Sequence, residues 1–170
     1  PSREGDKEKS IRTTIGYTIY GVKGDACISS KVIFTSLPVL DIETRSGDLP
    51  GEEDEQGFLN LFSAEYGIIW LDQTPIEINL RGNTSKRLPK KSYRVKIVDE
   101  SGEKENLSIA GLRSDDDWIL NPMYADTSKL REKLGYDLWM LMNSSGTAAN
   151  SSRLEYAEVF INGRYWGLYG

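Results

Sequence analysis

Alternating apolar and polar positions predict two neighbouring β-strands near the middle of the chain. They lie in PIEINLRG, residues 75–82, and in SYRVKIV, residues 92–98. In both segments apolar side chains take every second position: Ile76, Ile78 and Leu80 in the first, and Tyr93, Val95 and Ile97 in the second. Such a period of two is typical of strands with one buried and one solvated face. Arg94 and Lys96 then fall on the polar face.

Further strands are predicted on both sides of this pair. IRTTIGYTIYGV (11–22) is rich in β-branched residues, and KVIFTSLPVLDIET (31–44) is a second extended segment that bends or meets a sheet edge at Pro38. Residues 47–57, with their Gly, Pro and acidic content, are predicted to form a loop. Near the end of the chain, Asn162-Gly163 between two β-rich runs predicts a type I′ hairpin.

One long helix is predicted over residues 126–143, with Asp126 as its N-cap. Its apolar residues recur at helical spacing on one face: Leu130, Leu134, Leu138, Leu141 and Met142. The pattern as a whole therefore predicts an α+β fold with several strands and one long helix.

Composition narrows the possible chemistry. The chain has 170 residues, enough for one ordinary domain, and its first ten residues are charged and predicted to form a flexible tail. It contains no histidine and a single cysteine, Cys27, which excludes Ser-His-Asp and Cys-His catalysis, the usual zinc sites and an intrachain disulfide. No apolar run approaches the ~20 residues of a transmembrane helix, so no transmembrane segment is expected.

Positive charge is concentrated in RGNTSKRLPKKSYRVKI, residues 81–97, although acidic residues outnumber basic ones by 26 to 21 in the whole chain. Hydroxyl and backbone N–H groups around Gly82, Thr84 and Ser85, together with Lys and Arg, could hold a phosphate. A solvated basic hairpin explains the same pattern through long side chains that cover apolar surface. A nucleic-acid surface is a third reading, but the acidic remainder of the chain would repel a polyanion, so no nucleic-acid partner is expected.

The acidic run SDDDW, residues 114–118, has the residue type that suits Mg²⁺. Three consecutive Asp side chains cannot all face one ion on a regular element, so a polar turn is the better interpretation. No metal ligand and no catalytic residue is assigned from the sequence.

Five segments, in this order, resemble the spore-coat-protein-H (CotH) kinase family: FTSLPVLDIET, RGNTSKRLPKKSYRVKI, GLRSDDDWIL, ADTSKLREKLGYDL and VFINGRYWGLY. The resemblance covers roughly residues 34 to 170. It implies the small lobe of an atypical protein kinase, in which an antiparallel sheet carries one helix.

By this resemblance, Lys96 is the first candidate for the nucleotide-contacting lysine, with Lys91 and Arg94 as alternatives. Arg81, Asn83 and Ser85 in the preceding loop complete the predicted nucleotide-binding set. Glu132 is the predicted helix partner of the lysine, although a surface charge beside Lys129 and Lys133 explains it equally well.

The resemblance also implies a function. Members of the family transfer phosphate from ATP to Ser residues of proteins, so we expect ATP and Mg²⁺ or Mn²⁺ as cofactors of the full-length parent, with nucleotide and protein substrate as partners. Residues 11–170 are expected to be the amino-terminal part of a CotH-like domain that ends before the second lobe, and to be inactive alone. A non-catalytic binding or structural module is the alternative, and a secreted, cell-surface or spore-coat location is expected.

Overall fold

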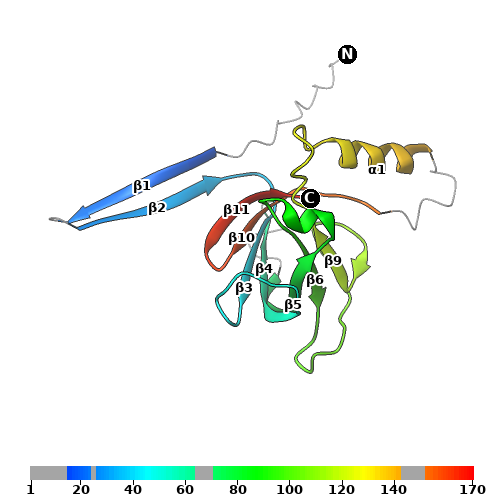
Figure 1. Cartoon of the computed structure of the whole chain (residues 1–170), viewed down its shortest axis with the longest axis horizontal. Coiled ribbons are helices and arrows are strands. Elements are labelled where there is room, and N and C mark those ends of the chain that lie inside the picture. The colour runs from blue at the N-terminus through cyan, green and yellow to red at the C-terminus, as the bar shows by residue number, and fades with distance from the viewer. Residues whose placement is uncertain (1–14, 24–25, 64–70, 143–151) are drawn as a thin grey trace, which may run out of the picture. The chain divides into compact units, whose positions relative to one another are not determined.

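The computed structural model describes residues 15–23, 26–63, 71–142 and 152–170 (Figure 1). The chain divides into two compact units, Pro1–Leu37 and Pro38–Gly170. In the first unit, β1 (Ile15–Lys23) and β2 (Ala26–Phe34) form an antiparallel hairpin in which Ile15 lies opposite Phe34. The predicted flexible tail, residues 1–10, lies outside the described residues.

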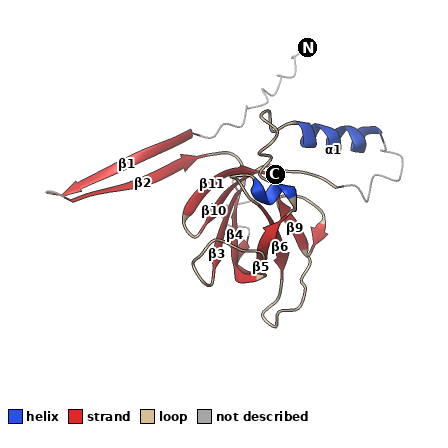
Figure 2. Cartoon of the chain, in the orientation of Figure 1, coloured by secondary structure: helices blue, strands red, loops and turns tan. Residues whose placement is uncertain are grey.

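The second unit is built on a seven-stranded sheet in the order β11-β10-β3-β4-β5-β6-β9 (Figure 2). Its strands are β3 (Val39–Thr44), β4 (Glu55–Phe62), β5 (Leu71–Arg81), β6 (Ser92–Ile97), β9 (Asp117–Leu120), β10 (Ala157–Ile161) and β11 (Arg164–Tyr169). The remaining elements are the two-stranded β7 (Leu107–Ser108) and β8 (Ser114–Asp115), the 3₁₀ helix η1 (Thr84–Arg87) and the helix α1 (Arg131–Met142).

The sheet curls until its two ends meet. Asn121, directly after β9, and Gly170, directly after β11, exchange two backbone hydrogen bonds of 2.8 Å. This single pair joins the outermost strands at one point and leaves the rest of the seam open. The second unit is therefore a half-barrel of mostly β structure.

The predicted fold class is wrong. The sheet is mixed, because β10 pairs with β3 in parallel, and the chain is mostly β rather than the α+β antiparallel small lobe of a kinase. The β10–β3 pair joins segments more than a hundred positions apart, from Val39 to Ile161. Local alternation predicts that a strand forms, but it does not say which strand will lie beside it.

The apolar positions of the predicted strands form the core. Of the predicted inward-facing residues on β5 and β6, Ile76, Ile78, Tyr93, Val95 and Ile97 are buried, and Leu80 is partly buried against the same core. They pack with inward residues of the other strands: Leu40, Ile42, Leu59, Leu61, Leu120, Val159, Ile161 and Tyr169. Arg94 and Lys96 point to the opposite face, as the alternation predicts.

The predicted hairpin at Asn162-Gly163 is confirmed. Both residues have positive φ, 52° and 69°, which a type I′ turn requires. The side chain of Asn162 also ties this turn to the end of β3: its Oδ1 accepts from the backbone N–H of Thr44 at 2.9 Å, and its Nδ2 donates to the carbonyl of Asp48 at 2.9 Å.

The helix begins five residues later than predicted, at Arg131 instead of Asp126. The Asp126 carboxylate accepts from the backbone N–H groups of Ser128 and Arg131, at 3.1 and 2.9 Å, so it closes a turn that precedes the helix. Lys129, with a φ of 59°, interrupts helical geometry between them. Four residues of the predicted apolar stripe lie on α1, whereas Leu130 precedes it. All five are exposed: Leu130, Leu134, Leu138, Leu141 and Met142.

Candidate functional site: the basic segment and a cavity beside β9

The loop between β5 and β6 begins with a glycine in a conformation that other residues adopt only with strain. Gly82 has a φ of +104°, and a Cβ there would lie 1.9 Å from the Oγ of Ser85. The Ser85 hydroxyl therefore rests on the backbone of Gly82. Asn83 is exposed, and its backbone carbonyl accepts from the backbone N–H of Lys86 at 3.3 Å. The Asn83 side chain makes no capping hydrogen bond to η1. The predicted phosphate contacts of Asn83 and Ser85 stay predictions.

Lys91 holds the end of this loop. Its ammonium donates to the carbonyl oxygens of Lys86 and Leu88, at 2.7 and 2.9 Å. Lys86 in turn forms an ion pair of 3.0 Å with Glu52. The side chains of Lys91 and Lys86 therefore tie this loop to its own backbone and to Glu52.

Lys90 is half-buried against β11. Its ammonium donates to the carbonyl of Leu168 and lies 4.1 Å from the centre of the Tyr169 ring. Burial, and then repulsion from Lys129, lower the pKa of Lys90 to about 8, while Glu158 acts in the opposite direction. No local pattern distinguishes this lysine from its neighbours, because its environment is set by β11, nearly eighty positions away.

Lys96 lies on the polar face of the sheet between two carboxylates. It donates to Asp54, which precedes β4, and to Glu77 on β5 at 3.2 Å. Asn79 donates to the other oxygen of Asp54. The hydrogen bond to Asp54, ahead of the one to Glu77, raises the pKa of Lys96. Its charge is thus matched inside the protein, and only 19% of the side chain is exposed.

Arg94 links β6 to β9. Its Nε donates to both oxygens of Asp117, at 2.8 and 3.0 Å, and a terminal nitrogen also donates to Oδ2. The hydrogen bond from Arg94 lowers the pKa of Asp117. This forked pair fixes the position of Asp117 at the edge of the sheet.

Glu132 lies on α1 and accepts from the Nδ2 of Asn121. The ion pair predicted between Lys96 and Glu132 is not formed among the described residues, since Lys96 contacts Asp54 and Glu77 instead. The contact with Asn121 ties α1 to the point where β9 meets Gly170.

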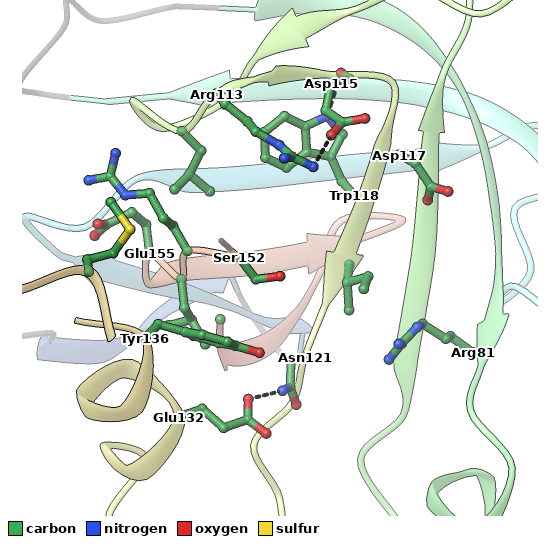
Figure 3. Close-up of a pocket in the computed structure, with 16 residues that line it drawn as sticks. Arg81, Arg113, Asp115, Asp117, Trp118, Asn121, Glu132, Tyr136, Ser152 and Glu155 are labelled. Atoms are coloured by element: carbon green, nitrogen blue, oxygen red, sulfur yellow. Dashed lines mark hydrogen bonds and ion pairs between the residues drawn. The ribbon is translucent and has the colours of Figure 1, made fainter. Parts of the chain in front are cut away.

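A cavity of about 660 Å³ opens between α1, β9 and the segment 152–155 (Figure 3). Tyr136 extends from α1 across it towards β9, with the Asn121–Glu132 contact at one end and the Arg113–Asp115 pair at the other. Of the predicted site residues, the cavity brings together Arg81 and Glu132. The other five lie on the polar sheet face or in the loop.

The carboxylates that line the cavity all have partners. Asp115 pairs with Arg113 at 2.7 Å and Glu155 with Lys133 at 3.2 Å, whereas Asp117 and Glu132 have the partners described above. Two guanidinium groups at the wall, Arg81 and Arg153, have no ion pair or hydrogen bond from their side chains within the described part of the chain. The cavity wall therefore carries two cations without a partner, Arg81 and Arg153, and one carboxylate, Glu132, whose partner is the neutral amide of Asn121.

The three consecutive Asp residues form ion pairs with three different cations, in agreement with the interpretation as a polar turn. Asp115 and Asp117 bind Arg113 and Arg94, and Oδ2 of Asp116 lies 3.0 Å from the Lys104 ammonium, an ion pair without a hydrogen bond. Within residues 15–23, 26–63, 71–142 and 152–170, no group of three or more acidic or cysteine side chains is placed to hold a metal ion.

Sequence reasoning missed most of this cavity. Tyr136, Arg153 and Trp118 carried no local pattern that distinguished them, and they meet only because β9, α1 and the segment before β10 converge. Asp54, which binds Lys96, lies in the predicted loop 47–57. That loop is confirmed up to Asp54, and only its last three residues belong to β4.

The family model described as CotH kinase protein matches residues 78–170, more than half of the chain. The chain belongs to the CotH kinase family, and membership indicates a kinase-like or spore-coat function. The match covers all seven predicted site residues. No curated protein matches the chain. Among the helices that the structure describes, none has the length and apolar character to span a membrane.

Proposed function

We propose that this chain is part of a CotH-type protein kinase that transfers phosphate from ATP to Ser residues of proteins. The chain supplies one portion of the nucleotide site and is inactive alone. The family match supports this proposal, because it spans Arg81, Lys96 and Glu132 together with the other predicted site residues. The catalytic and metal-binding carboxylates belong, in this proposal, to a part of the protein outside these 170 residues.

The observation that carries the proposal is the unmatched guanidinium of Arg81 in the cavity beside β9. A guanidinium can bind phosphate oxygens through two parallel hydrogen bonds. The cavity volume, about 660 Å³, lies within the range of small-molecule sites. The ring of Tyr136, which crosses the cavity, offers a face on which a base can stack.

Phosphoryl transfer from ATP also needs Mg²⁺ or Mn²⁺ held against the phosphates. The donor set of the described residues does not fit such an ion, because the acidic side chains nearest the cavity are each engaged by a donor of their own. We therefore assign no metal ligand to this part of the protein.

A second function is favoured by the surroundings of Lys96. Two carboxylates hold its ammonium, as expected for a structural ion pair in a binding or structural module that performs no phosphotransfer. Such a module would suit a spore-coat, cell-surface or secreted protein.

Labelled-phosphate transfer from ATP with Mg²⁺ or Mn²⁺ separates the two proposals. This chain is compared with a longer chain from the same gene, using a mixture of Ser-containing proteins as acceptors. Transfer by the longer chain alone is the expected result. Transfer by the 170-residue chain would contradict the assignment of the catalytic carboxylates to another part of the protein. Absence of phosphate transfer by both chains would favour the non-catalytic module.

A further inference from the structure

Two lysines from distant segments lie beside the hydrogen-bonded pair Asn121–Gly170. Lys129, in the turn before α1, donates its ammonium to a carbonyl two residues after Asn121. Lys90, in the loop before β6, donates to a carbonyl two residues before Gly170. Burial, and then repulsion from Lys129, lower the pKa of Lys90, so the two ammonium groups are close enough to repel each other.

Neither ammonium group has a carboxylate partner within the part of the chain that the structure describes. A lysine has three N–H donors, and each of these lysines uses one of them on a backbone carbonyl. Glu158 acts to raise the pKa of Lys90, but its carboxylate accepts from the Tyr165 hydroxyl at 2.6 Å. The other carboxylates of these segments have partners of their own: Glu132 accepts from the neutral amide of Asn121, and Asp126 accepts from Ser128 and Arg131.

The turn that carries Lys129 is held in a strained conformation. Met123 and Lys129 have φ values of 47° and 59°, in the left-handed region that residues other than glycine seldom adopt. The Met123 carbonyl accepts from the Lys129 ammonium and also from the backbone N–H of Asp126. The Tyr156 hydroxyl donates to the carbonyl of Lys129 itself. Strain of this kind is concentrated at binding and catalytic sites, and here it fixes the position of one cation.

Strand β11 fixes the position of the second cation, Lys90. Its ammonium is bound by the carbonyl of Leu168 and lies 4.1 Å from the centre of the Tyr169 ring. The backbone of Gly167 approaches it closely, since a Cβ at that residue would lie 3.5 Å from the Lys90 Nζ. Three successive residues of one strand therefore hold the ammonium in place, and none of them carries a negative charge.

Two fixed cations side by side favour a ligand with more than one negative charge. A phosphate group carries a charge of about −1.5 to −2 at neutral pH and three acceptor oxygens, whereas a carboxylate carries a single charge. Lysine binds phosphate as a point charge, through short charge-assisted hydrogen bonds. A phosphate between the two ammonium groups would also relieve the repulsion between them.

We propose that Lys90 and Lys129 together bind a phosphate group beside the pair Asn121–Gly170. Each ammonium donates to a phosphate oxygen while it keeps its bond to a backbone carbonyl. Neither lysine lines the cavity, so the site is separate from the guanidinium of Arg81. The assignment of this phosphate to ATP rests on the proposed kinase function, whereas the binding of phosphate by the two lysines does not.

Binding is tested by isothermal titration calorimetry on the longer chain from the same gene, at pH 7 and without metal. The probes are inorganic tripolyphosphate and ATP, at an ionic strength held constant with chloride. Lys90→Met and Lys129→Met should each weaken tripolyphosphate binding by about ten-fold, the effect of one charge-assisted hydrogen bond. The chain has a net charge of −5, so non-specific attraction does not draw an anion to it.

Two further variants separate the site from a general effect of charge. Lys104→Met removes the same charge from an ion pair with Asp116 whose lysine is 73% exposed, and it should leave tripolyphosphate binding unchanged. Lys129→Arg retains the positive charge and should bind tripolyphosphate more tightly than Lys129→Met.

Lysine labelling supplies a readout that does not depend on any variant folding. In the wild-type chain, tripolyphosphate should slow reductive methylation of Lys90 and Lys129, followed by mass spectrometry, and leave that of Lys104 unchanged. Equal tripolyphosphate affinities of Lys90→Met, Lys129→Met and the wild type would overturn the proposal. Unchanged labelling of the two lysines would overturn it too, as would loss of tripolyphosphate binding in Arg81→Ala alone.

The two probes identify the source of the phosphate. If ATP binding depends on the same two lysines, the site holds phosphates of a nucleotide. If tripolyphosphate binding depends on Lys90 and Lys129 but ATP binding does not, the phosphate site stands and its ligand is an inorganic phosphate. If ATP binding depends on both lysines but no labelled phosphate is transferred, the site stands and only the kinase function fails.

Discussion

Lys96 is predicted to stabilise the fold whether or not it contacts a nucleotide. The variant Lys96→Met keeps the aliphatic stem and removes the charge that lies between Asp54 and Glu77. Exposed ion pairs contribute about 0.2–1 kcal/mol, and hydrogen bonds to charged groups about 1.5–3 kcal/mol. Because the Lys96 side chain is only 19% exposed but its two partners are 38% and 29% exposed, we expect a loss of about 1.5 kcal/mol.

The matched control is Lys104→Met. Lys104 also forms an ion pair, with Asp116 at 3.0 Å, but its side chain is 73% exposed. Its loss should cost under about 0.5 kcal/mol. In thermal and urea unfolding followed by circular dichroism, Lys96→Met should lower Tm by about 3–6 °C, and Lys104→Met by about 1 °C.

The pH dependence supplies a second check on the same variant. The folded state raises the pKa of Lys96 above its ordinary value of 10.5, so its contribution is complete below pH 10.5 and disappears as the pH rises through the folded value. The stability difference between wild type and Lys96→Met should follow that course. If Lys96→Met costs no more than Lys104→Met at neutral pH, the reasoning from burial is refuted.

Three further predictions concern stability. Lys90, with its pKa lowered to about 8 from 10.5, binds its proton more weakly in the folded state; stability should therefore rise by about 1 kcal/mol from pH 8 to 10, and urea titrations of Lys90→Met should lack this rise. Gly82→Ala should cost about 1–2 kcal/mol in urea unfolding, because alanine is strained at a φ of +104° and its Cβ displaces Ser85; an unchanged midpoint would contradict that geometry. Ile78→Ala, at a fully buried position, should cost about 2–5 kcal/mol by calorimetry, and a loss below about 1 kcal/mol would mean that this core is loosely packed.

The sequence predicted local features well where short-range chemistry determines them. The strand alternation on β5 and β6 appeared on the predicted faces, and Asn162-Gly163 formed the predicted turn, because side-chain period and positive φ are properties of neighbouring residues. The predicted start of α1 was wrong because Asp126 closes a separate turn before the helix. An Asp side chain favours a helix cap and such a turn equally, so its residue type does not decide between them.

The features that were missed depend on distant contacts. The parallel β10–β3 pair, which overturned the predicted fold class, joins residues separated by more than a hundred positions. The cavity likewise needs the approach of α1, β9 and the segment 152–155. Of the predicted site residues, Arg81 and Glu132 both line the cavity. Lys96 and Arg94 instead form ion pairs with carboxylates whose proximity could not be predicted from the sequence.

The most direct measurement is ATP binding by the longer chain, with Arg81→Ala compared with Arg87→Ala in isothermal titration calorimetry. Arg81 lines the cavity and Arg87 is exposed outside it. If the cavity beside β9 holds the phosphates, Arg81→Ala should weaken ATP binding by about ten-fold and Arg87→Ala should leave it unchanged. Equal ATP affinities for the two variants and the wild type would contradict the proposed nucleotide site.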